Sequence, residues 1–207
     1  MAEAISLTLN EAGYVVGQSS TAINRAVDRG VIKAKLQRRG KSRLRKVGPA
    51  ELRYLAIASL VEKDLTPAAR RKLYEAVRRL PAEVHRLDLG VMELKLADID
   101  KRISERLLRL EEVKALVEEH DDADPVLRGT AVPVYVVAAL AKGQTAAEIV
   151  EDYPGLSLEQ VDAAVDYAKV YPRTGRPLPA RSFKRMLGDL AELGVWDLEG
   201  DAPPKQP

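Results

Sequence analysis

Apolar residues recur at intervals of three or four along most of this chain, which is the period of an α-helix that buries one face. Ser or Thr precedes several of these stretches, as N-cap residues do, and Gly or Pro follows them. Because aromatic residues make up only 4% of the chain, the core must consist mainly of Leu, Val, Ile and Ala. The sequence therefore predicts a mainly α-helical protein.

Breaks in the helical pattern divide the chain into four segments. We expect a winged helix-turn-helix with a small β-hairpin, a helical linker or dimerisation segment, a three-helix domain of helix-turn-helix-like shape, and a tail, at residues 1–50, 51–118, 119–178 and 179–207. The hairpin strands are expected at 32–36 and 43–47. The helices are expected at 11–16 (with Asn10 as its cap), 20–29, 51–63, 67–80, 91–119, 135–142, 146–152, 158–167 and 182–193.

Composition and motifs exclude several classes of protein. The chain has no Cys, so it has no disulfides and no thiolate metal ligands, and we expect it in a reducing cytoplasm. We expect no signal peptide, and no stretch approaches the roughly 20 apolar residues of a membrane span. His85 and His120 have no partner at a metal-ligand spacing, and the glycines form no phosphate-binding loop. We therefore expect a protein that is not an enzyme and has no metal and no cofactor.

Positive charge is concentrated in one stretch, although the net charge of the chain is only +2. Between Gly17 and Gly48, Asp28 is the only acidic residue. The basic residues of this stretch are Arg25, Arg29, Lys33, Lys35, Arg38, Arg39, Lys41, Arg43, Arg45 and Lys46. Such a density of like charge costs self-repulsion, and it indicates a polyanionic partner.

The order of elements in this stretch is that of a winged helix-turn-helix. Helical spacing places Thr21, Asn24 and Arg25 on one outward face, where Asn can bind adenine and Arg can bind guanine. The cations of the hairpin would contact phosphates. We expect contacts to duplex DNA from Ser20, Thr21, Asn24, Arg25, Arg29, Lys33, Lys35, Arg38, Arg39, Lys41, Arg43 and Arg45. The alternative is a solvated basic hairpin on a generic helical domain.

The segment resembles the winged helix of MerR and excisionase proteins, whose helix-turn-helix opens with a phrase like Leu9-Asn10-Glu11-Ala12. It lacks the aromatic residues often present in that wing. The resemblance implies a DNA-binding transcriptional regulator.

The apolar stripe of the long helix has two interpretations. It can form a dimer interface, because a single winged helix contacts little DNA and paired half-sites require a dimer. Alternatively, it can pack against the protein's own helices at 51–63 and 67–80. The residues of this stripe are Ile99, Ile103, Leu107, Leu110, Val113 and Val117.

Residues 119–178 contain several separate motifs. These are Asp124-Pro125-Val126-Leu127-Arg128-Gly129-Thr130-Ala131-Val132-Pro133-Val134, Gly143-Gln144-Thr145-Ala146-Ala147-Glu148-Ile149 and Asp152-Tyr153-Pro154-Gly155-Leu156-Ser157. Together they resemble domain-of-unknown-function family 433 (DUF433), whose signature includes Gly-Thr-Arg-(Ile/Val)-Pro-Val. Ala131 stands where that family has its arginine.

The family resemblance implies a function and a partner. Members of the family resemble VapB-type antitoxins, which are encoded beside PIN-like ribonuclease toxins. The resemblance implies a type II antitoxin that neutralises its toxin, represses its own operon by binding DNA, and forms a homodimer or a larger complex with the toxin. Two alternatives are a MerR-like or excisionase-like regulator without a toxin, and an adaptor whose basic hairpin contacts RNA or an acidic protein.

The tail combines an amphipathic helix with several arginines, which is typical of a helix that binds a groove. Residues 146–168 carry acidic residues but no Lys or Arg, so the third segment suits protein binding better than DNA reading. An inserted arginine could neutralise the metal-binding carboxylates of a PIN-like nuclease. The alternative is that the helix packs on the protein's own core. The expected toxin-binding residues are Arg173, Arg176, Arg181, Phe183, Arg185, Met186, Leu187, Leu190, Leu193 and Trp196.

Overall fold

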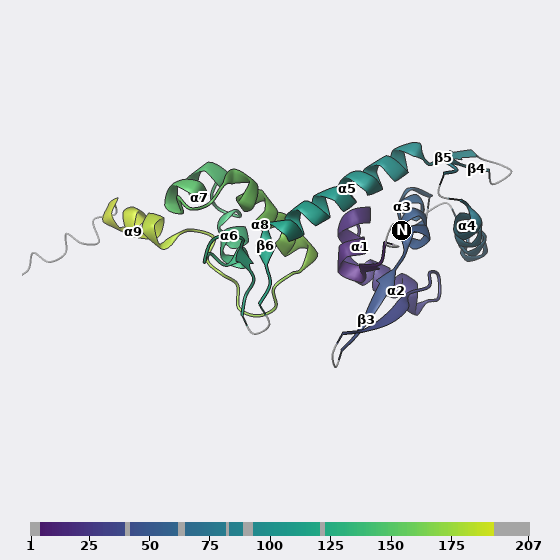
Figure 1. Ribbon diagram of the computed structural model, residues 1–207, viewed down its shortest axis with the longest axis horizontal. Helices are drawn as coiled ribbons and strands as arrows, with labels where there is room; N and C mark the ends of the chain where they lie inside the picture. Colours follow the sequence, from purple (N-terminus) through teal and green to yellow (C-terminus); the bar gives the residue numbers. More distant parts are fainter. Residues whose placement is uncertain are drawn as a thin grey trace, which may run out of the picture. The chain divides into compact units, whose positions relative to one another are not determined.

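The computed structural model describes residues 5–39, 42–61, 65–81, 83–88, 93–120 and 123–192, without the side chains of Arg39 and Ser42. The chain divides into two compact units, Met1–Glu112 and Val113–Pro207. Both units are mainly helical, as the sequence predicted, and both contain small antiparallel sheets (Figure 1). Within the described residues, no helix has the length and apolar character that crossing a membrane requires.

The first unit begins with two short helices and a hairpin. Its elements are β1 (Leu7–Thr8), α1 (Leu9–Val16), α2 (Ser20–Asp28), β2 (Lys35–Arg39) and β3 (Ser42–Val47). The three strands form an antiparallel sheet in the order β1-β3-β2, so β3 is the central strand. Leu7 and Val47 face each other across this sheet, and both are buried. The sheet is thereby fixed to the core that α1 and α2 also share.

The turn between α1 and α2 depends on two glycines. Gly17 ends α1 in the left-handed conformation, with a φ of 71°, where glycine carries no steric penalty. Gly13 lies so close to the following chain that an added Cβ would be 2.6 Å from the carbonyl oxygen of Gln18.

The start of α1 corrects one expectation. Thr8 is the N-cap rather than Asn10, because Thr8 and Glu11 form a reciprocal capping box.

Two helices follow the hairpin and are connected to it. They are α3 (Pro49–Val61) and α4 (Pro67–Arg79). The Tyr74 hydroxyl of α4 donates a hydrogen bond to Glu51 of α3 at 2.7 Å and accepts one from the Lys33 backbone N–H at 3.1 Å. Burial, followed by the bond to Glu51, raises the pKa of Tyr74 to about 12. Tyr74 therefore stays neutral and ties α3 and α4 to the segment that enters β2.

A short hairpin precedes the long helix. Strands β4 (Arg86–Asp88) and β5 (Glu93–Lys95) pair antiparallel, and α5 spans Ala97–Ala115. The helix expected over 91–119 is therefore shorter than predicted. Residues 93–95 of the expected helix form a strand instead, because Leu87 and Leu94 pair across the hairpin and Leu87 is buried.

The apolar stripe of α5 lies within the protein's own packing. Ile99, Leu110, Val113 and Val117 are buried, and Val113 and Val117 belong to the core of the second unit. The half-buried Ile103 and Leu107 line a hollow that Leu52 of α3 and Val77 of α4 also line. The burial of four of the six stripe residues supports the alternative of packing within the chain. A dimer interface on this stripe stays a prediction.

Within its described residues, the second unit contains a two-stranded sheet and four helices that follow α5. Its elements are β6 (Val117–Glu118), β7 (Val126–Leu127), α6 (Val134–Leu140), α7 (Ala146–Asp152), α8 (Leu158–Val170) and α9 (Phe183–Glu192). Capping boxes begin α7 at Thr145–Glu148 and α8 at Ser157–Gln160. One core joins β6, β7, α6, α7 and α8. The sequence predicted both bounds of α7 and the first residue of α8 correctly, and α8 continues three residues further than expected.

Candidate nucleic-acid interface and partner-binding helix

The α2 helix buries one side and exposes the polar face predicted from its sequence. The Ser19 side chain caps the helix by accepting a hydrogen bond from the Ala22 N–H at 3.2 Å. Ile23 is fully buried and fixes the helix to the core. Thr21, Asn24, Arg25 and Arg29 are exposed, whereas Ser20 is half-buried. The residues that would read base edges are therefore accessible.

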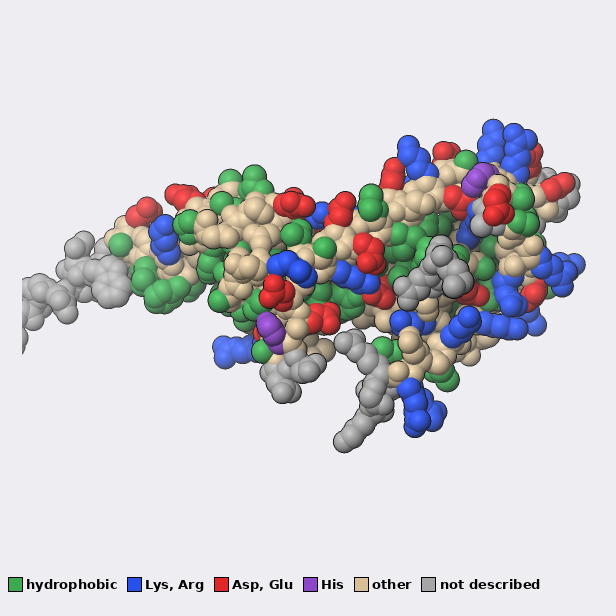
Figure 2. All heavy atoms as spheres, in the orientation of Figure 1, with side chains coloured by type: hydrophobic (Ala, Val, Ile, Leu, Met, Phe, Trp, Pro, Cys, Tyr) green, Lys and Arg blue, Asp and Glu red, His purple; other side chains and the backbone are tan. Residues whose placement is uncertain are grey.

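The β2–β3 hairpin presents a basic face. Arg38 lies directly opposite Arg43, and Leu36 lies directly opposite Arg45. Because side chains alternate across a strand, Arg38, Arg43 and Arg45 share one face of the hairpin. All three side chains are exposed, and Figure 2 shows Lys and Arg side chains over the hairpin and over α4. The fold thus brings onto one face of the hairpin basic residues that the sequence showed only to be close together along the chain.

Two cross-strand pairs in this hairpin bring like charges together. Arg38 faces Arg43 on one face, and Lys35 faces Lys46 on the other. Like charges directly opposite each other destabilise a sheet. None of these four side chains has an ion-pair partner among the residues that the structure describes. An external anion would relieve the repulsion, so the hairpin has the electrostatics of an anion-binding element.

Arg45 joins the basic face of the hairpin to α2. Its guanidinium donates hydrogen bonds to Asp28 at 2.6 Å and to Asn24 at 3.1 Å. The face of Arg38, Arg43 and Arg45 is therefore continuous with the polar face of α2. Arg45 and Asp28 are about half exposed, and ion pairs of this kind contribute about 0–1 kcal/mol. One hairpin cation is thus paired with a carboxylate of the chain itself, in a pair weak enough to exchange for phosphate.

On the hypothesis that this basic surface binds duplex DNA, removing the charge of Asp28 should strengthen that binding. The variant Asp28→Asn loses the only carboxylate in this basic stretch and frees Arg45. We expect an affinity gain of roughly fivefold, about 1 kcal/mol, from the loss of one repulsive charge close to phosphate. Fluorescence anisotropy with a labelled duplex measures the change. The matched control is Glu105→Gln on α5, also an exposed acid of the first unit, which should have little effect. Weaker binding by Asp28→Asn would mean that Asp28 positions Arg45 for contact instead.

A second cluster of arginines was not among the predicted contacts. Arg70 and Arg71 of α4 line a hollow of about 550 Å³ together with Arg25 and Arg29 of α2. Of the described residues that line it, four are arginines and none is Asp or Glu. The run Arg70-Arg71-Lys72 is visible in the sequence, but only the packing of α4 beside α2 brings it to the candidate interface. The structure therefore extends the basic surface from α2 onto α4.

The remaining predicted DNA contacts do not all lie on this surface. Lys33 and Lys35 are exposed, but Lys35 is on the other face of the hairpin from Arg38. Because side chains alternate along β2, Lys35 and Arg38 point to opposite faces of the hairpin. They therefore cannot both contact the same stretch of the DNA backbone. Lys41 and the side chain of Arg39 lie outside the described residues.

The α9 helix exposes the apolar stripe predicted for the tail. The exposed fractions are 73% for Phe183, 43% for Met186, 37% for Leu187 and 38% for Leu190. No residue of α9 is buried, and hydrophobic side chains gather on the surface at α9 in Figure 2. The stripe therefore faces solvent, as a partner-binding helix requires. Leu193 and Trp196 lie outside the described residues.

A polar network attaches the beginning of α9 to α7. The Ser182 hydroxyl and the Arg185 guanidinium donate to Asp152 at 2.6 and 3.0 Å, and the Ser182 N–H donates to Gln144 at 2.9 Å. The guanidinium of Arg185 also contacts Glu148 at 3.2 Å. The side chain of Asp152 is only 3% exposed. The helix is thus held by its N-terminal polar residues, while its apolar side chains point elsewhere.

Three of the tail arginines form ion pairs within the chain, and their expected contact with a toxin stays a prediction. Arg185 binds carboxylates of α7, Arg181 pairs with Asp189, and Arg173 pairs with Asp124. Arg185 is only 27% exposed and contacts several carboxylates of α7, so it is poorly suited to insert into a partner's carboxylate site, whereas the more exposed pairs of Arg173 and Arg181 are weak enough to exchange for a partner's carboxylate. Arg176 alone among the four has no ion-pair partner in the described part of the chain.

Neutralising Asp152 should release α9. The bond from Ser182, followed by those from Gln144 and Arg185, holds the pKa of Asp152 below its ordinary 3.8 against the opposing effect of desolvation. Because the folded-state pKa is depressed, the attachment is fully present above pH 3.8 and is lost as pH falls through the lower folded value. Hydrogen bonds to charged groups contribute about 1.5–3 kcal/mol, so Asp152→Asn should speed amide exchange in α9 roughly tenfold or more at neutral pH.

Hydrogen exchange of residues 183–192 measures this release. The matched control is Glu151→Gln, because Glu151 also contacts Arg185, at 3.0 Å, but is largely exposed. It should change exchange little. Equal acceleration in both variants would contradict the central role of Asp152.

Metal binding has no support in the described part of the chain, where no three His, Asp or Glu side chains lie close enough to hold an ion. Ala131, at the position where the DUF433 signature has arginine, is exposed.

One region of the chain matches a family model. Residues 122–168 match the family model described as protein of unknown function (DUF433). This DUF433 region covers α6, α7 and most of α8. The chain is also similar to the uncharacterised protein y4eO of Sinorhizobium fredii (strain NBRC 101917 / NGR234), with 38% identity over 96 residues. That match covers 44% of this chain and 40% of the relative. No solved structure matches the chain.

Proposed function

We propose that the first unit binds duplex DNA as a winged helix-turn-helix. In this proposal α2 enters the major groove, with Asn24 and Arg25 at base edges, and the β2–β3 hairpin is the wing that contacts the adjacent phosphates. One observation carries the proposal. The directly opposed Arg38 and Arg43 lie on the hairpin face that Arg45 joins to α2.

Two features favour DNA over RNA or an acidic protein as the partner. The helix α2 exposes amide and guanidinium groups along one face, and the major groove of B-form DNA admits such a helix. The deep, narrow major groove of A-form RNA does not admit side chains in this way. An acidic protein would not require the arginines of α2, α4 and the hairpin to lie on one continuous surface.

Binding should weaken steeply as salt rises. Six to ten phosphate contacts correspond to a loss of about 10³–10⁵ in affinity between about 50 and 200 mM salt, through release of counterions. Anisotropy titrations of a duplex library across this range test the prediction, with single-stranded RNA of the same length for comparison. A shallow salt dependence, or tighter binding to the RNA, would overturn the DNA proposal.

We further propose that the chain is an antitoxin of a type II toxin–antitoxin system and represses its own operon. The exposed apolar stripe of α9 supports a protein partner, because an amphipathic helix of this spacing fits a hydrophobic groove. The DUF433 region carries the resemblance to VapB-type antitoxins. From this resemblance we expect the partner to be a PIN-like ribonuclease toxin. The alternative is a MerR-like or excisionase-like regulator without a toxin. Co-expression with the adjacent reading frame, pull-down and a ribonuclease assay distinguish the two.

A further inference from the structure

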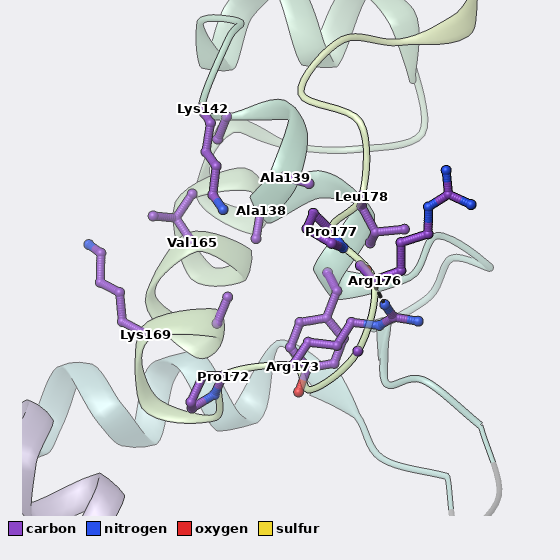
Figure 3. Close-up of a pocket in the computed structure, with 14 residues that line it drawn as sticks. Ala138, Ala139, Lys142, Val165, Lys169, Pro172, Arg173, Arg176, Pro177 and Leu178 are labelled. Carbon is purple, nitrogen blue, oxygen red and sulfur yellow. Dashed lines mark hydrogen bonds between the residues drawn. The ribbon is translucent and has the colours of Figure 1, made fainter. Parts of the chain in front are cut away.

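The second unit contains a hollow that the DNA and antitoxin proposals do not use. It lies between α6, α8 and the segment 172–178, and its volume is about 530 Å³ (Figure 3). Small-molecule sites usually have volumes of about 300–1,000 Å³ and mostly apolar walls with a few polar groups. The size of this hollow therefore suits a small organic ligand.

The floor of the hollow is apolar and comes from three parts of the chain. Figure 3 shows Ala138 and Ala139 of α6, Val165 of α8, and Pro177 and Leu178 around the space. The small alanine side chains leave the room that the ligand would fill. The ring of Tyr135 also lines it, and the Tyr135 hydroxyl donates to the Tyr171 carbonyl oxygen at 2.9 Å.

The rim of the hollow is cationic on two sides. Lys142 and Lys169 lie along the helices, and Arg173 and Arg176 lie on the opposite segment. None of the described lining residues is Asp or Glu. Beyond the lining, Lys169 pairs with Asp166 at 3.0 Å and Arg173 pairs with Asp124 at 3.3 Å.

Lys142 and Arg176 have no ion-pair partner among the described residues. Because these two cations lack partners and lie on either side of an apolar floor, a ligand that fits the hollow should carry a negative charge. The Arg173 guanidinium also donates to the Arg176 carbonyl oxygen at 3.2 Å, which braces the segment that carries Arg176.

We propose that this hollow binds an amphiphilic organic anion, with an apolar body on the floor and an acidic group at Lys142 or Arg176. An apolar body removes the floor from water, and the acidic group neutralises the rim. A neutral molecule of the same shape satisfies only the first requirement. The class of ligand is therefore a carboxylate or sulfonate carrying an aromatic or aliphatic body.

The fluorescent probe 8-anilinonaphthalene-1-sulfonate tests this site on the full chain, because it is an aromatic sulfonate. We expect saturable binding at one site with enhanced fluorescence. Octanoate should displace the probe, and octanol at the same concentration should displace it far less. Displacement by both to the same extent would show a merely apolar site and would overturn the proposal.

Charge reversal then locates the probe. The double variant Lys142→Glu and Arg176→Glu should weaken probe binding at least tenfold, and the neutral pair Lys142→Gln and Arg176→Gln should give an intermediate loss. If the charge-reversed double variant does not fold, the neutral double variant provides the test. The matched control is Arg128→Glu, an exposed cation of the same unit outside the lining, which should bind the probe normally.

The exposed stripe of α9 is the competing site for an apolar probe. Phe183→Asp should leave the fluorescence unchanged if the hollow is the site. Loss of the signal in Phe183→Asp, or equal binding by the charge-reversed and wild-type chains, would overturn the proposal. Neither result depends on DNA or partner binding.

Discussion

The double variant Arg25→Glu and Arg29→Glu should lose at least 100-fold in affinity for duplex DNA while retaining its fold. Arg25 lies on α2 and Arg29 is the C-cap residue of that helix; both side chains are exposed, and both line the hollow that Arg70 and Arg71 also line. A good bidentate contact from Arg contributes about 1–3 kcal/mol, so losing two contacts and introducing repulsion costs about 3 kcal/mol or more. Anisotropy titration at fixed salt measures the loss, and far-UV circular dichroism checks the fold.

A control with the same change of net charge separates local contacts from overall attraction. Lys101 and Arg102 are adjacent exposed cations on α5 in the same unit. Their reversal to Glu should lower the affinity only slightly, because distant charges are screened within about 10 Å at 0.1 M salt. Equal losses in the two double variants would refute the proposed interface and leave only nonspecific attraction to DNA.

The double variant Phe183→Asp and Leu187→Asp should abolish binding of the partner protein and preserve binding to DNA. These residues are one helical turn apart on the exposed stripe of α9. Truncation of a buried interface anchor costs about 2 kcal/mol or more, and a buried unpaired carboxylate costs more still. The loss should therefore exceed roughly 100-fold. Since neither side chain is buried in the chain itself, the fold should tolerate both changes.

The control places a charge elsewhere on the same helix. Gly188 is exposed, and a Cβ added there meets no atom within 4 Å. Gly188→Asp lies away from the stripe and should bind the partner normally. Titration calorimetry with the product of the adjacent reading frame measures both variants. Undiminished binding by Phe183→Asp with Leu187→Asp would exclude α9 as the partner-binding helix.

The Asp152 network affects how the α9 variants are interpreted. Ser182 and Arg185 hold the start of α9 on α7 through polar contacts, which the apolar substitutions do not touch. If the partner binds only when α9 is attached to α7, the variant Asp152→Asn should also lose binding. If the partner binds α9 alone, Asp152→Asn should retain binding. Measuring both variants shows whether the attachment forms part of the binding surface.

Local features of the sequence determined the helices and their ends. The caps at Thr66, Thr145 and Ser157 were predictable, because each cap is a contact between residues three apart in the chain. The basic stretch and the exposed face of α2 were also predictable from charge and helical spacing. The cap at Thr8 was missed because Asn10 is an equally good capping residue by type, whereas the reciprocal contacts of Thr8 with Glu11 select Thr8.

Tertiary packing alone decided which of these surfaces are available. The spacing of the α5 stripe is the same for a dimer interface and for an internal contact, and only the packed fold shows that Ile99, Leu110 and Val113 are buried. The arginines of the tail and of α4 looked alike in sequence, yet Arg185 is neutralised by α7, while Arg71 lines the same hollow as Arg25. Periodicity and charge are properties of neighbouring residues. Burial and ion pairing depend on contacts between segments far apart in the chain, which the sequence pattern does not specify.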